Sequence, residues 1–204
     1  MSPVISEPVN ARSRRTRTTL LEAARAILQE EGFEALTMTA VADRAGVTRR
    51  GVYLHFPTRA ELVGAIYDHV AEVEGLAISL DRVWSAPDAV SALDEWAAHL
   101  ARYHPRVLAV DRAVQRVWED DPDAAAHRAR VVAGKLAGCR RLARWLADEG
   151  SLASAWTTQS AADMLFALVA SDVIEALIVD RRWSRARLAR HLSVLLRSTF
   201  ASAG

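Results

Sequence analysis

Apolar side chains recur every three or four residues along almost the whole chain, and this spacing limits the possible folds more than any other feature. It is the spacing of one face of an α-helix. The longest example lies within residues 122–149, and its apolar seam consists of Ala125, Ala129, Val132, Leu136, Cys139, Ala143 and Leu146. No stretch alternates apolar and polar residues for long enough to predict a strand. Only nine glycines and six prolines interrupt 204 residues rich in helix formers, so we predict an all-α fold.

The N-terminal segment divides into an arm and a first helix. Residues 1–12 hold two prolines and show no periodicity, so we expect a disordered arm. Ser13 is the expected N-cap of a helix that runs to about Glu31, and Gly32 ends this helix.

Caps, prolines and apolar spacing also predict the later helices. Thr58 and Glu61 form a capping box that opens a long helix through Val73. Residues 81–87 are the expected break after it. The other helices are predicted at 38–45, 49–55, 88–103, 105–119, 122–149, 161–179 and 184–200. Ser160 with Asp163 would cap the helix at 161–179, and Ser184 would cap the last one.

Secreted, zinc-binding and membrane classes of protein are not expected. Cys139 is the single cysteine, so an internal disulfide is impossible, and no histidine-cysteine cluster has zinc spacing. Residues 1–10 lack the apolar stretch of a signal peptide, and the cytoplasm is therefore the expected compartment. The segment 161–179 is apolar almost all round, but it is too short to span a bilayer and carries three acidic residues.

An enzyme is not expected either. Gly134-Lys135 lacks the upstream glycine and the Ser/Thr of a phosphate-binding loop, and the chain has no G-x-S-x-G motif. His99 and His104 are five residues apart and do not share a helix face. We therefore predict no catalytic residue, no cofactor and no metal site.

Charge is unevenly distributed along the chain, although the net charge is only +1. Residues 1–59 carry nine arginines against six acidic residues, whereas residues 60–204 carry 17 basic and 19 acidic side chains. A basic head on a slightly acidic body favours a polyanionic partner for the head.

Residues 37–56 read TMTAVADRAGVTRRGVYLHF and have the pattern of a helix-turn-helix. Thr37 is expected to cap the first helix and Thr48 the second. Gly46 lies between the helices and supplies the positive φ that a tight turn needs. Apolar residues of both helices would form a small shared core, namely Val41, Ala42, Ala45, Val47, Val52 and Phe56. The second helix of such a motif enters the major groove of DNA.

The outer face of that second helix carries side chains suited to DNA. Arg49 or Arg50 can fork onto O6 and N7 of a guanine. Gly51 has no side chain, so its backbone can approach the groove closely. Three further residues are placed to bind phosphates: Thr48, Tyr53 and His55. The alternative is an ordinary helical hairpin with a solvated charged face.

From about Arg15 to Val70, these residues resemble the TetR family of one-component transcriptional regulators. The matching residues are Gly32-Phe33, Thr37, Val41-Ala42, Ala45-Gly46-Val47-Thr48, Val52-Tyr53, His55-Phe56 and Arg59-x-Glu61-Leu62. The resemblance implies a three-helix DNA-binding head, a linking fourth helix, and a helical body that binds a ligand and dimerises through its last two helices. The expected domains are therefore the arm at 1–12, a helix-turn-helix domain at 13–57, and a ligand-binding and dimerisation domain at 58–204.

The resemblance also implies roles for individual residues of the head. By position, the phosphate contacts would be Thr37, Thr48, Tyr53, His55 and Arg59, and the base-reading surface would be Arg49, Arg50 and Gly51. Arg59 stands where a lysine is usual, which keeps the charge. The arm region adds Arg12, Arg14, Arg15 and Arg17. In several DNA-binding proteins such arms enter a minor groove, but a solvated tail is equally compatible with the sequence.

Three helices of the body carry mixed polar and apolar stripes, which is what the walls of a ligand pocket need. The candidate ligand-binding residues are Trp96, His99 and Tyr103 on the first, Leu136 and Cys139 on the second, and Met164, Leu168 and Asp172 on the third. They suggest a mostly apolar small molecule, with a slight preference for a cationic or hydroxylated one if Asp172 is ionised there. The alternative is a filled core in which Asp172 pairs with an arginine.

The opposite side of the helix at 161–179 is purely apolar and favours a second subunit. It consists of Leu165, Phe166, Val169, Val173, Ala176 and Leu177. We therefore predict a homodimer, formed through the helices near 161–179 and 184–200, that represses transcription from a palindromic DNA operator and releases it on binding an effector. The alternatives are an activator, or an architectural DNA-binding protein without a ligand.

Overall fold

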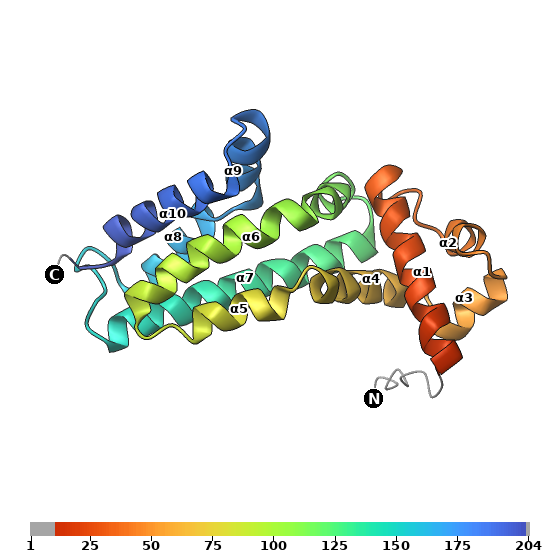
Figure 1. Ribbon diagram of the computed structural model, residues 1–204, viewed down its shortest axis with the longest axis horizontal. Coiled ribbons are helices and arrows are strands. Elements are labelled where there is room, and N and C mark those ends of the chain that lie inside the picture. Colours follow the sequence, from red (N-terminus) through yellow and green to blue (C-terminus); the bar gives the residue numbers. More distant parts are fainter. Residues whose placement is uncertain (1–10, 203–204) are drawn as a thin grey trace. The chain divides into compact units, whose positions relative to one another are not determined.

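The computed structural model describes residues 11–202, and within them the chain is built of α-helices and one π-helical turn (Figure 1). Regular strands are absent from this described part, where Leu152 and Ala201 form an isolated antiparallel bridge. The predicted all-α fold is confirmed. The residues group into two compact units, one made of the N-terminal residues up to 70 together with 109–128, and the other of 71–108 together with the residues from 129 onward.

The first unit, called the head here, contains the N-terminal helices, the end of α6 (Ala89–Gln115) and the start of α7 (Pro122–Asp148). The N-terminal helices are α1 (Ala11–Glu30), α2 (Met38–Ala45), α3 (Arg49–His55) and most of α4 (Arg59–Val73). Their apolar stripes meet in one core, whose members with at most 2% exposure include Leu20, Ala24, Ile27, Phe33, Leu36, Val41, Val52, Phe56, Leu62 and Ile66. The core spans the segment that carries the helix-turn-helix pattern.

The start of the first helix differs from the prediction. Ser13 does not cap α1, because the helix already includes Ala11 and Arg12; the expected arm otherwise lies outside the described residues. The hydroxyl groups of Thr16, Thr18 and Thr19 donate to carbonyl oxygens one turn earlier in this stretch. The four arginines at positions 12, 14, 15 and 17 therefore lie on a helix rather than in an arm.

The second unit, called the body here, contains the remaining helices. They are α5 (Leu76–Trp84), the larger parts of α6 (Ala89–Gln115) and α7 (Pro122–Asp148), α8 (Thr158–Leu168), α9 (Ser171–Glu175), the π-turn η1 (Ala176–Asp180) and α10 (Arg185–Phe200). Their fully buried side chains form one core, which includes Val83, Leu93, Ala97, Leu142, Leu146, Leu165, Val169, Leu188, Leu196 and Phe200. Figure 1 shows α10 running alongside α6, and Ser193 of α10 donates to Asp94 of α6 at 2.6 Å.

Helix boundaries in the body correct the sequence prediction in three places. The expected break at 81–87 is shorter, because α5 continues to Trp84. The helices expected at 88–103 and 105–119 are one helix, α6, with Pro105 inside it. The single helix expected at 161–179 is divided into α8, α9 and η1, since the backbone of Ala170 is extended at φ −58° and ψ 145°.

Other boundaries agree with the prediction. Helix α7 starts at Pro122, and Ser184 caps α10 by accepting from the Arg187 N–H. The cap of α8 is Thr157, paired with Ser160 in a capping box, rather than Ser160 paired with Asp163. None of the helices in the described part is both long enough and apolar enough to cross a bilayer.

Candidate nucleic-acid interface

Helices α2 and α3 are joined by a tight turn at Gly46. This glycine adopts φ 66° and ψ 32°, in the left-handed region that residues with a Cβ rarely adopt. The Val47 N–H then donates to the Ala42 carbonyl at 3.0 Å, which closes the end of α2. The predicted helix-turn-helix, including the need for glycine in its turn, is confirmed.

Both helices begin with the predicted threonine caps. Thr37 Oγ1 accepts from the Ala40 N–H at 3.1 Å, and Thr48 Oγ1 accepts from the Gly51 N–H at 3.1 Å. Each hydroxyl keeps its own proton for donation to another acceptor. Both threonines are exposed, so the caps stabilise the helices and leave an O–H on the surface at each N-terminus.

Helix α3 buries one side and exposes the other. Val52 is fully buried and fixes the helix on the core of the head. Arg49 and Arg50 are exposed on the outer side, and the Arg49 guanidinium donates to the Tyr53 hydroxyl at 3.2 Å. Leu54, which the sequence reasoning did not single out, is 77% exposed on the same helix. An apolar side chain placed beside arginines can contact a thymine methyl group.

Gly51 has no structural need to be glycine. A Cβ at this position would meet nothing closer than Thr48 Oγ1 at 3.4 Å, which is ordinary van der Waals contact. Glycine inside a helix costs about 1 kcal/mol relative to alanine. No contact within the head requires glycine at this position, so we expect the reason for the glycine to lie in a molecule that approaches α3 from outside the head.

Arg17 of α1 contacts the C-terminal end of α3. Its guanidinium donates to the His55 carbonyl at 3.1 Å and lies 4.3 Å from the centre of the Phe56 ring. Burial, with a smaller contribution from the Arg17 charge, lowers the pKa of His55 below its ordinary value. A neutral imidazole still has one N–H, so His55 can donate to a phosphate.

Arg59 is placed differently from the other predicted phosphate contacts. Its guanidinium lies 3.0 Å from Asp121 and 2.8 Å from Asp123, and its Nε donates to the Leu36 carbonyl at 3.0 Å. The same group stacks over the Phe33 ring at 4.8 Å. These contacts hold the charge inside the head, so we remove Arg59 from the candidate DNA-contacting set.

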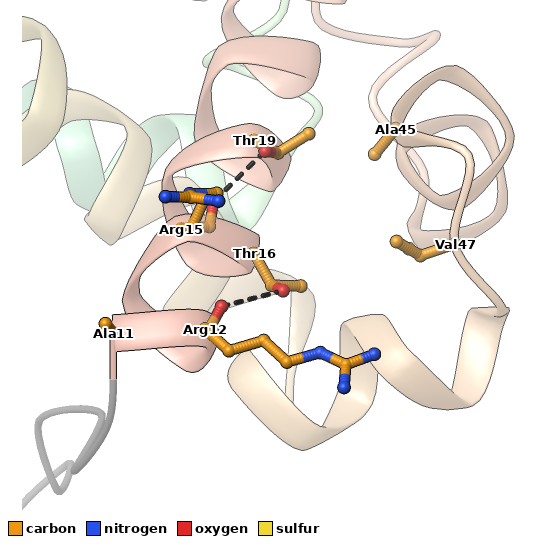
Figure 2. A pocket seen from close by; sticks show the side chains of 7 residues that line it. All are labelled: Ala11, Arg12, Arg15, Thr16, Thr19, Ala45 and Val47. Atoms are coloured by element: carbon orange, nitrogen blue, oxygen red, sulfur yellow. Dashed lines mark hydrogen bonds between the residues drawn. The ribbon is translucent and has the colours of Figure 1, made fainter.

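A hollow on the surface of the head is lined in part by Arg12 and Arg15, two arginines that the sequence analysis assigned to the arm region. It is lined by Ala11, Arg12, Arg15, Thr16 and Thr19 of α1 and by Ala45 and Val47 of the turn (Figure 2). Figure 2 shows the Arg12 side chain extending from α1 toward the side of the hollow that carries Val47. Arg12 thus extends toward the helix-turn-helix, whereas the Arg15 guanidinium points away from Ala45 and Val47 in Figure 2.

The structure brings some of the candidate ligand-binding residues together and leaves others apart. His99 lies between Trp96 and Tyr103, with ring centres 5.5 Å and 5.6 Å away. Cys139 is buried in the same core, where burial raises the pKa of its thiol to about 12. Leu136 and Leu168 are half-buried.

Met164 and Asp172 do not belong to this buried group. Both are exposed, whereas Leu165 and Val169, predicted to face a second subunit, are fully buried in the protomer's own core. The predicted division into two sides is therefore wrong for these four residues, whereas Val173 on the predicted subunit side is 44% exposed and Leu168 on the predicted pocket side is half-buried. The division into α8 and α9 explains part of the error, because it changes the register of the stripes after Val169.

Comparison with known proteins agrees with the geometry of the head. Residues 20–66 match the family model described as bacterial regulatory proteins, tetR family. Over 57 residues the chain is 40% identical to the HTH-type transcriptional regulator TtgR of Pseudomonas putida, and the match covers 28% of this chain and 27% of that regulator. The probable HTH-type transcriptional regulator ArpR of Pseudomonas putida matches to the same extent. The chain thus matches only about a quarter of the length of these relatives.

Solved structures share the fold over nearly the whole chain. NalD, described as the secondary repressor of the MexAB-OprM multidrug efflux pump in Pseudomonas aeruginosa, superposes with a TM-score of 0.72 at 21% identity, covering 96% of this chain and all of that one. A complex of SmeT with triclosan gives a TM-score of 0.73 at 21% identity, with 93% of each chain covered. A putative transcriptional regulator from Saccharomonospora viridis in complex with choline gives 0.71 at 15% identity, with 93% and 100% covered.

The family-model match, the capped α2 and α3 with their glycine turn, and the all-helical architecture agree with one another. The solved structures share the all-helical fold of this chain. Residues 20–66 of this chain thus match the tetR family of bacterial regulatory proteins, and in the structure they contain a helix-turn-helix.

Proposed function

We propose that this regulator is a homodimeric repressor that binds a palindromic operator and releases it when a small, mostly apolar effector enters the body. The observation that carries the proposal is the outer face of α3, where Arg49, Arg50 and Tyr53 are exposed around a glycine that the head does not itself require. Such a repressor would act in the cytoplasm, where a bacterial operator is found.

DNA recognition would divide between two sets of residues. Arg49 and Arg50 would read bases in the major groove, with Gly51 allowing the backbone of α3 to come close. The phosphate contacts would come from four residues at the helix ends and on α3, namely Thr37, Thr48, Tyr53 and His55. The Arg12 and Arg15 side chains beside the hollow on α1 are candidates for further phosphate contacts.

The dimer would form through α8 and α10. Met164 of α8 and Leu195 of α10 are large apolar side chains on the protomer surface, and Val194 of α10 is 60% exposed. Apolar side chains gathered on the last helices favour a protein–protein contact over permanent exposure to water. Val169 and Leu192 are buried within the protomer, so a charge at either position would disturb folding rather than test the dimer.

The effector would bind among α6, α7 and α8, near the Trp96, His99 and Tyr103 stack. Both α6 and α7 supply residues to the head as well as to the body, so a ligand between them can favour one arrangement of the heads over another. Release would follow if the effector binds better to a conformation whose two heads no longer match successive major grooves.

Selection from random double-stranded DNA at moderate salt tests the DNA-binding step. We expect enrichment of an inverted repeat. Arg50→Ala should weaken binding by about 1–3 kcal/mol and relax the preference at one base position, whereas Tyr53→Phe should weaken binding evenly across sequences. Arg140→Ala is the control, because it removes one exposed cation from the body and should leave the preference unchanged. A selection that enriches no motif would overturn the proposal.

A reporter under the selected operator separates repression from its alternatives. Lower expression in the presence of the regulator supports a repressor, and higher expression supports an activator. Release of operator by a compound that binds the body supports effector control, whereas an architectural protein would keep its operator whatever the compound.

A further inference from the structure

The body buries a group of nitrogen-bearing side chains whose role is not explained by folding alone. His99 and His104 of α6 are buried, and Lys135 of α7, the only lysine in the chain, is half-buried. His99 Nδ1 lies 2.9 Å from the Ser79 hydroxyl of α5. Lys135 Nζ lies 3.4 Å from the Val169 carbonyl and 3.4 Å from Ser171 Oγ, at the break between α8 and α9.

The electrostatic environment of the two histidines is positive. Burial, together with the charges of Arg102 and Lys135, lowers the pKa of His99 to about 4. Burial, Lys135 and His99 lower the pKa of His104 to about 3. Both imidazoles are therefore neutral near pH 7, and the charged side chains that lower their pKa values are Arg102, which also pairs with Glu95 at 3.4 Å, and Lys135. An anion placed among these side chains would raise the pKa values of the two histidines instead.

Trp96 supplies a second, independent observation. Its side chain is 4% exposed, and within the described part of the protein its buried Nε1 has no hydrogen-bond partner. The centre of its ring lies 5.5 Å from that of His99, and a Cβ added at Gly138 would lie 2.7 Å from Trp96 Cη2. A buried donor without an acceptor costs about 1–3 kcal/mol. The missing partner in this part of the core is an acceptor.

We infer that the effector of this regulator carries a carboxylate on an apolar body, and that the carboxylate is bound by Lys135 with His99, His104 and Trp96 beside it. The carboxylate would receive a charge-assisted hydrogen bond from the half-buried Lys135 and further hydrogen bonds from donors that are buried. The apolar body would lie against the aromatic stack. This inference rests on the proposed effector site, and it replaces the cationic preference suggested by Asp172, which is exposed.

Matched probes test the inference on the full-length protein. Decanoate, decanamide and decylammonium share one chain and differ in the charge of the head group. Titration calorimetry and thermal shift should show decanoate binding roughly tenfold or more tightly than decanamide, because hydrogen bonds to charged groups contribute about 1.5–3 kcal/mol and about 1.4 kcal/mol is a factor of ten. Decylammonium should bind more weakly than either.

The variant Lys135→Met keeps the stem of the side chain and removes its charge. It should abolish the preference for decanoate over decanamide while leaving decanamide binding nearly unchanged. Arg140→Met, on an exposed position of the same helix, is the matched control and should keep the preference. If Lys135→Met does not fold, the unmodified protein still gives a test. Decanoate should be bound with uptake of protons near pH 6, measured in two buffers of different ionisation enthalpy, because a nearby carboxylate raises the pKa of both histidines.

The outcomes separate this inference from the proposed function. Decanoate that does not bind, or binds no more tightly than decanamide, overturns the carboxylate site even if another compound releases the operator. Decanoate that binds with the expected preference but leaves a selected operator in place supports the site and contradicts effector control through it. Failure to select any operator overturns the proposed function whatever binds in the body.

Discussion

Arg59→Met is the substitution whose consequence the structure defines most sharply. The guanidinium joins the start of α4 to Asp121 and Asp123 at the start of α7, and to the Leu36 carbonyl before α2. All of these residues belong to the head. Methionine keeps most of the stem and removes the guanidinium, whose carbon lies 4.8 Å from the centre of the Phe33 ring. The variant therefore leaves two carboxylates close together without their cation.

The expected loss follows from how far these groups are removed from water. The side chains of Arg59, Asp121 and Asp123 are 28%, 24% and 21% exposed. Breaking a buried ion pair by removing one partner costs about 3–5 kcal/mol, whereas an exposed pair contributes at most about 1 kcal/mol. For this partly exposed cluster we expect the free energy of unfolding to fall by about 2–3 kcal/mol.

Urea unfolding without DNA is the assay, because it separates stability from phosphate binding. Arg59→Lys should recover part of the loss, since it keeps the charge but not the geometry that reaches the two carboxylates and Leu36. Arg44→Met is the matched control. Arg44 pairs with Glu30 at 2.6 Å on the surface, so its loss should cost less than about 1 kcal/mol.

A second substitution tests the cause of the effect. Replacing Asp121 and Asp123 by asparagine in the Arg59→Met background should restore part of the stability, because it removes the repulsion between the carboxylates. If Arg59→Met unfolds like the unmodified protein and only weakens operator binding, the assignment to an internal ion cluster is wrong. The phosphate contact implied by the family resemblance would then be correct.

Three further predictions follow from other positions. Gly51→Ala should raise the free energy of unfolding by up to about 1 kcal/mol, since the added Cβ meets nothing closer than Thr48 Oγ1 at 3.4 Å. The same variant should weaken operator binding several-fold in an anisotropy titration, and unchanged binding would exclude close approach of α3 to DNA. Val194→Glu should shift sedimentation toward the monomer, while Ile78→Glu, at an apolar residue of α5 that is 71% exposed, should not; equal behaviour of the two variants would contradict a dimer through α10. The pKa of His104 is about 3 in the folded protein and 6.5 ordinarily, so the unfolded chain binds a proton first and the free energy of unfolding falls as pH falls below about 6.5, by about 1.4 kcal/mol per pH unit from this residue. His104→Gln should therefore flatten the dependence of the urea midpoint on pH between about 6 and 4. An unchanged slope would show that His104 is not buried as a neutral group.

Local signals determined what the sequence could predict about the head. Thr37 and Thr48 accept from backbone N–H groups three residues later, and Gly46 adopts the positive φ that its turn requires. These interactions are completed within four residues of the chain, so no distant partner is needed to foresee them. The apolar spacing likewise placed Val52 on the buried side of α3, which left Arg49 and Arg50 outside.

Tertiary packing decided where two of the helices continue or end, which the local sequence did not predict correctly. Proline inside a helix costs about 3 kcal/mol, yet Pro105 lies within a continuous α6, because the burial of a long helix in the body outweighs a local penalty. The break after α8 falls at Val169 and Ala170, which carry no local signal for a helix end. Val169 is buried at that break, and its carbonyl lies near Lys135 from another helix.

The roles of charged residues were the hardest to foresee. A sequence shows that Arg59 is charged, but the two carboxylates that hold it are more than sixty residues away along the chain. Asp172 looked like a pocket residue from its stripe, and the division of its helix placed it on the surface. Local hydrogen bonding and helix periodicity were therefore determined by the sequence alone, whereas which polar groups are buried and paired was decided only by contacts between distant segments, since the free energy of a charge depends on what surrounds it.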